Sequence, residues 1–106
     1  MKPVKVVSNN SQFEALMSQI AKGICDTDIQ KQIDEAAAKQ DRRIKIPCIG
    51  QYIELMLLQR KEDIQNIHKY VVAITDYIAI ELVRAGYDFH FEHNLKHHDL
   101  DIVISW

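Results

Sequence analysis

Residues 87–106, YDFHFEHNLKHHDLDIVISW, alternate between apolar and polar side chains and decide the fold. Phe89 and Phe91 fall on one side of a first strand, and Leu100 and Ile102 fall on one side of a second. The opposite sides carry acids and a histidine, namely Asp88, His90, Glu92, Asp99 and Asp101. We therefore predict an antiparallel hairpin with one apolar face and one His/acid face, the latter formed by these five residues.

The turn of this hairpin sets its register. If residues 94–97 form the turn, Phe91 lies opposite Leu100, and His90 lies opposite Asp101 across the two strands. The apolar face would then pack on the core, while the His/acid face stays in contact with water.

The first third of the chain predicts one strand and two helices. The valine-rich residues 4–7 predict a short strand. Ser11 and Glu14 have the spacing of a capping box, which predicts a helix that ends near Gly23. The polar residues 26–28, Asp-Thr-Asp, then predict the start of a second helix with a narrow apolar side.

The middle of the chain predicts a short extended piece and two further helices. Residues 43–49 alternate in polarity and contain Pro47, which indicates an edge strand or a strand-like loop. Residues 51–58 are apolar at helical spacing, and residues 63–85 have the widest apolar stripe in the chain. We expect a break between these two helices near residues 59–62; the alternative is one continuous helix over residues 51–85, which would be unusually long for a domain of this size.

The predicted order is β-α-α-(β)-α-α-β-β, an α+β fold in which the C-terminal hairpin packs on the long central helix. The 106 residues, 47% hydrophobic and 26% charged, suit a single domain spanning residues 1–106. A net charge of −2 gives no strong field toward nucleic acid or an anionic membrane. Without a signal-like or membrane-spanning apolar run, and with only two cysteines, we expect a cytoplasmic protein without a membrane partner.

The His/acid face offers ligands for a divalent metal ion. His90, Glu92, Asp99 and Asp101 lie at alternate positions on two neighbouring strands, and imidazole and carboxylate are common ligands of transition metals. Such a site would indicate a metal-dependent hydrolase or nuclease. The alternative is a solvated polar face, because His93 projects to the opposite side of the strand from His90.

The string HDLDIV, residues 98–103, resembles the strand on which nucleotidyltransferases present paired metal-binding aspartates. The resemblance covers only these residues and implies metal-assisted nucleotide transfer. It departs from the family pattern because no Gly-Ser turn and helix precede it and no third carboxylate strand follows it.

A basic cluster and an outer helical face are the remaining candidate sites. Arg42, Arg43 and Lys45 form a cluster that nucleic-acid binding would need, although cations at a helix end also stabilise the helix itself. Separately, the side chains of Tyr70, Tyr77 and Ile80 project from the 63–85 helix and suit a protein interface. The alternative is that another element of the same domain covers this helical face.

No pattern in the sequence names a reaction or a resident cofactor. We therefore expect a small cytosolic protein-binding or regulatory module without catalytic activity, which binds another protein or itself as a homodimer. A metal-dependent hydrolase or nuclease is the second hypothesis, and nucleic-acid binding through the basic cluster is the third.

Overall fold

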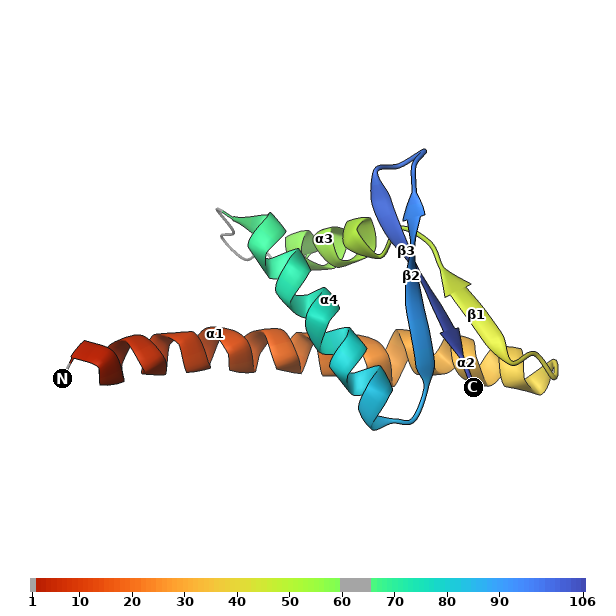
Figure 1. Ribbon diagram of the computed structural model, residues 1–106, viewed down its shortest axis with the longest axis horizontal. Coiled ribbons are helices and arrows are strands. Elements are labelled where there is room, and N and C mark those ends of the chain that lie inside the picture. The colour runs from red at the N-terminus through yellow and green to blue at the C-terminus, as the bar shows by residue number, and fades with distance from the viewer. Residues whose placement is uncertain (1, 60–65) are drawn as a thin grey trace.

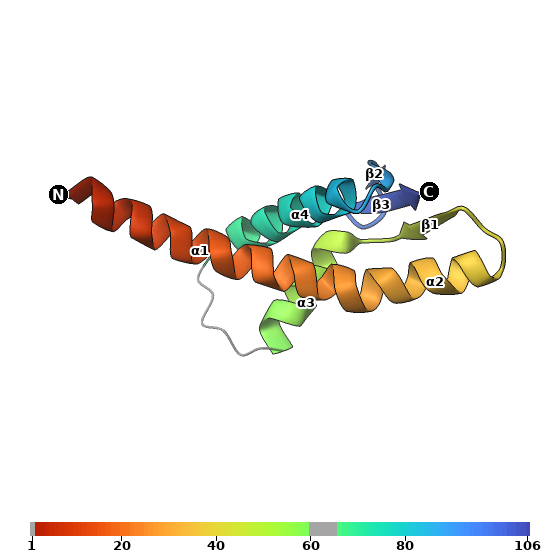
Figure 2. The same ribbon diagram turned by 90° about the horizontal axis from the view of Figure 1, so that it is seen from below.

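One long helical rod runs through the whole molecule (Figures 1 and 2). It consists of α1 (Lys2–Ile24), the π-helical turn η1 (Cys25–Ile29) and α2 (Gln30–Ala38). A helix that runs from residue 2 to residue 38 is roughly 55 Å long, which matches the longest dimension of the molecule, 55 Å. The computed structural model describes residues 2–59 and 66–106, with side chains from residue 12 onward.

The π-helical turn keeps the apolar side of the rod facing the core. The buried positions along the rod are Met17, Ile20, Ala21, Ile24, Ile29, Ile33 and Ala36, of which Ile29 is the last residue of the π turn. Regular α-helical spacing would bring Asp28 to the core after Ile24, whereas the wider π turn brings Ile29 there. The rod therefore continues past Gly23, whose carbonyl accepts a 2.7 Å hydrogen bond from the Thr27 hydroxyl.

Two predictions for this part of the chain were wrong. Residues 4–7 are helical, because α1 begins at Lys2 rather than at Ser11. Pro3 lies in the first helical turn, where its missing N–H removes no hydrogen bond. The N-terminal end of α1 projects away from the sheet (Figure 1), so residues 4–7 have no neighbouring strand there. The predicted boundary between two helices, an end at Gly23 and a new start at residues 26–28, was also wrong, because the π turn continues the rod through these residues.

Three antiparallel strands form the sheet, in the spatial order β1-β3-β2. They are β1 (Arg43–Ile46), β2 (Asp88–Asn94) and β3 (Asp99–Ser105). The α+β fold class and the C-terminal hairpin are thereby confirmed. The predicted extended piece is confirmed as a strand at one edge of the sheet.

The hairpin register differs from the prediction by two residues. His90 lies opposite Val103, so the predicted pair of His90 with Asp101 is wrong, and Phe91 lies opposite Ile102. The turn begins one residue later than predicted and occupies residues 95–98. Because a shift of two residues keeps every side chain on its own face, the division into an apolar face and a His/acid face survives. The expectation that the His/acid face stays in contact with water is wrong in the central strand, because Asp101 and Val103 are buried there.

Two separate helices, α3 (Ile49–Gln59) and α4 (Ile67–Arg84), complete the fold. The segment near residues 59–62, where we predicted the break, lies largely outside the described residues. α4 packs on α1, α3 and β2, and α3 packs on α4 and β3. The most deeply buried side chains of the two helices are Ile49, Ile53, Leu57, Ile74 and Ile78. None of the described helices is long and apolar enough to cross a lipid bilayer.

Candidate functional site

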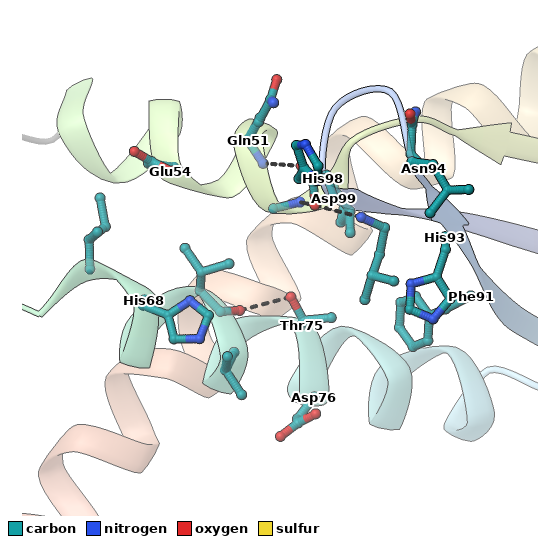
Figure 3. Close-up of a pocket in the computed structure, with 17 residues that line it drawn as sticks. Gln51, Glu54, His68, Thr75, Asp76, Phe91, His93, Asn94, His98 and Asp99 are labelled. Atoms are coloured by element: carbon teal, nitrogen blue, oxygen red, sulfur yellow. Dashed lines mark hydrogen bonds between the residues drawn. The ribbon is translucent and has the colours of Figure 1, made fainter.

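A groove of about 860 Å³ opens between α3, α4 and the tip of the β2–β3 hairpin (Figure 3). Its apolar lining comes from all three elements and consists of Ile49, Ile67, Val71, Val72, Phe91, Leu95 and Leu100. Concave, mainly apolar surfaces with a few polar groups are the usual form of binding sites. The groove is therefore a candidate binding site.

Three histidines contribute polar groups to the groove (Figure 3). His68 comes from α4, His93 from β2, and His98 from the turn, where its φ of 52° is in the left-handed region. Among the described residues, no hydrogen bond joins one of these imidazoles to a carboxylate. The groove therefore offers apolar contact and separate hydrogen-bonding groups, rather than an assembled acid–base pair.

The carboxylate of Asp99 ties the hairpin tip to the beginning of α3. It accepts hydrogen bonds from the backbone N–H groups of Gly50 at 3.1 Å and Gln51 at 2.8 Å (Figure 3). The first N–H groups of a helix lack intrahelical partners and carry a partial positive charge, so a carboxylate stabilises them. Two walls of the groove are thus held together by one side chain of β3.

A second carboxylate, that of Asp101, is buried beside this contact. It accepts hydrogen bonds from the Cys48 backbone N–H at 3.0 Å and from the Asn94 amide at 3.1 Å. The Cys48 N–H, the Asn94 amide and the nearby Lys45 ammonium together lower the pKa of Asp101. Asp101 is therefore an ionised structural group that joins β3 to the segment before α3.

Lys45 links this buried acid to the exposed part of the His/acid face. Its ammonium lies 3.1 Å from Glu92 and 3.5 Å from Asp101. The His90 imidazole lies 3.0 Å from the other oxygen of Glu92. Hydrogen bonds from His90 and Lys45 lower the pKa of Glu92, and the same contact with Glu92 raises the pKa of Lys45.

The four predicted metal ligands do not converge on one point. His90 and Glu92 contact each other, whereas Asp99 faces the N-terminus of α3 and Asp101 is held by Cys48 and by side chains of neighbouring strands. Among residues 2–59 and 66–106, no group of three or more His, Cys, Asp and Glu side chains is arranged to hold a metal ion. The metal site stays a prediction, and the observed contacts give the four residues other partners.

The predicted interface residues divide into two groups. The Tyr70 ring packs edge-to-face on Phe13 of α1 at 5.3 Å, and the Tyr77 hydroxyl donates a hydrogen bond to Glu14 of α1. Ile80 is 42% exposed. The rod therefore contacts the two tyrosines within the chain, which agrees with the alternative that another element of the same domain covers this helical face. An interface at Ile80 stays a prediction.

The basic cluster offers fewer free cations than its sequence indicates. Arg42 and Arg43 are exposed at the start of β1. Lys45 is instead paired with two acids of the His/acid face. Nucleic-acid binding stays a prediction that rests on the two arginines.

Sequence reasoning missed the groove, because its walls meet only in the folded chain. One signal was present in the sequence, since Leu95 is an apolar residue in an otherwise polar turn. In the structure its side chain is 83% exposed.

Comparison of the chain with protein-family models, curated proteins and solved structures gives no match.

Proposed function

We propose that this chain is a protein-binding module that receives an apolar segment of a partner protein in the groove between α3, α4 and the hairpin tip. The observation that carries the proposal is the apolar lining, which continues onto exposed side chains at the rim. Val72 of α4 lines the groove and is 46% exposed, and Leu95 lines it from the turn. Leu58 lies one helical turn beyond Glu54, on the same side of α3.

The extent of this apolar surface favours a polypeptide over a small molecule. A small ligand on the groove floor would leave the exposed leucine and valine side chains of the rim in water, whereas a peptide can lie across both floor and rim. Polar groups surround the apolar floor, among them Gln51, His68, Thr75 and His98. An apolar centre with a polar rim is the usual organisation of a protein interface.

A peptide-display library panned against the immobilised full chain tests this proposal. The groove variants are Val72→Asp and Leu95→Asp, and the matched control is Val83→Asp, an exposed valine of α4 outside the groove. We expect apolar peptides that bind the wild type and the control equally, and that bind each groove variant about tenfold or more weakly. Failure to enrich any peptide, or equal binding to all variants, would contradict the proposal.

A further inference from the structure

β2 is an open edge of the sheet. It lies at the end of the strand order, and Figure 2 shows it on the side of the sheet away from α2. Among the described residues, no other strand pairs with its outer side. The outward N–H and C=O groups of such a strand form a template for pairing with another chain.

The other edge of the sheet has the features by which proteins prevent such pairing. β1 has only four residues, carries Arg43 and Lys45, and is followed by Pro47. β2 has seven residues and contains neither lysine nor proline. Short length, basic side chains and proline protect sheet edges, so β1 is protected and β2 is not.

Two phenylalanines of β2 remain incompletely covered. Phe89 and Phe91 lie on the apolar face, contact each other edge-to-face at 5.8 Å, and are only partly buried. One more strand beside β2 would cover the ring surfaces that the chain itself leaves exposed to water.

We propose that β2 pairs antiparallel with β2 of a second copy of this chain, about a two-fold axis at Phe91, to give one continuous sheet through both copies. In this register Phe91 lies opposite Phe91 of the second copy. His90 lies opposite Glu92 of the second copy, and Glu92 lies opposite its His90. Asp88 lies opposite the neutral Asn94. Each charged side chain therefore meets an opposite charge, a hydrogen-bond partner or a neutral amide.

The neighbouring registers lack this complementarity. A slip of two residues in one direction places His90 opposite itself and Asp88 opposite Glu92. The same slip in the other direction places Glu92 opposite itself, and like charges directly opposite each other are destabilising. A slip of one residue sets the phenylalanines against the polar face of the other copy. The sequence DFHFEHN thus specifies one symmetric pairing.

The proposed pairing and the groove share Phe91, but each can be tested by changing residues that the other does not use. Side chains alternate along β2, so Phe91 and His93 line the groove, while His90 and Glu92 lie on the opposite face. A charge change at His90 therefore tests the pairing without altering the groove lining.

Sedimentation velocity of the full chain, from micromolar to millimolar concentration, tests the pairing. His90→Glu sets like charges opposite each other, His90→Lys places a cation opposite Glu92, and His97→Glu introduces the same acidic side chain in the exposed turn. We expect wild type, His90→Lys and His97→Glu to form a dimer, and His90→Glu to associate about tenfold or more weakly. A wild type that stays monomeric throughout, or a His90→Glu variant that associates like the wild type, would overturn the proposal.

Two further measurements separate the possible failures. Amide hydrogen exchange should show that protection within β2 increases with wild-type concentration, and unchanged protection would count against the pairing. Val72→Asp should dimerise like the wild type, and His90→Glu should keep the circular dichroism spectrum and the peptide binding of the wild type. Loss of groove binding alone then contradicts the proposed function, and loss of dimerisation alone contradicts this inference.

Discussion

The Asp99 carboxylate oxygen lies 2.6 Å from the position that a Cβ atom on Gly50 would occupy. The same oxygen accepts the Gly50 backbone N–H at 3.1 Å. The hydrogen bond and the close approach have one cause, since the carboxylate must come this near to reach the first turn of α3. Gly50 is therefore required by contact with β3, not by an unusual backbone angle.

We predict that Gly50→Ala destabilises the protein by about 1–3 kcal/mol, because the added methyl group displaces the Asp99 carboxylate. In an open helix the same change would stabilise by about 1 kcal/mol, because alanine is the better helix former. Gly23→Ala is the matched control, since a Cβ there meets no atom within 4 Å. We expect it to stabilise by about 0.5–1 kcal/mol. Urea unfolding measures both, and a stabilising Gly50→Ala would contradict the contact.

The cap itself gives a second prediction. Asp99→Ala should lower the free energy of unfolding by about 1 kcal/mol, because two N–H groups of α3 lose their acceptor. Asp99→Asn should lose less, because its amide oxygen still accepts one hydrogen bond. In a double-mutant cycle, Gly50→Ala should cease to be destabilising once Asp99 is alanine. Strict additivity of the two changes would show that they do not act through one contact.

The parts of the fold that depend on a local period could be predicted from the sequence. Ile74, Ile78 and Leu82 recur at helical spacing and are buried on one side of α4. Ile102 and Ile104 alternate along β3 and are buried on one face of the sheet. Both patterns follow from backbone geometry alone, so no knowledge of the neighbouring elements was needed.

The errors arose where the outcome depends on distant residues. The step from Ile24 to Ile29 breaks the α-helical period, and the sequence does not show that a π turn will absorb it. Asp99 was a predicted metal ligand, yet its partner Gln51 is 48 residues away in the chain. A carboxylate in a polar strand pattern carries no local sign of the helix that it will cap. The groove likewise forms only when α3, α4 and the hairpin pack together.

The acids around Lys45 predict a loss of stability in acid. Because the pKa values of Asp101 and Glu92 are lowered, both groups bind protons less readily in the folded than in the unfolded chain. Their stabilisation is complete above the unfolded values of about 4 and is lost as the pH falls through the lower folded values. The midpoint of urea unfolding should therefore fall as the pH is lowered from neutral to below about 4.

Asp101→Asn provides the control for this pH dependence. The amide keeps one oxygen for the Cys48 N–H but cannot titrate, so the variant should be less stable at neutral pH and lose less stability in acid. Equal losses for the variant and the wild type would show that Asp101 does not contribute to acid unfolding.

The last prediction concerns the thiol in the π turn. Burial, and then the carboxylates of Glu81 and Asp26, raise the pKa of Cys25 to about 12. Because the thiolate is the reactive form, Cys25 in a Cys48→Ala variant should react with a disulfide reagent at mildly alkaline pH about a hundredfold or more slowly than a free thiol. Urea should restore the ordinary rate, because unfolding removes both causes. Rapid reaction of Cys25 in the folded protein would contradict the raised pKa, because a partly buried thiol with an ordinary pKa reacts without any opening of the π turn.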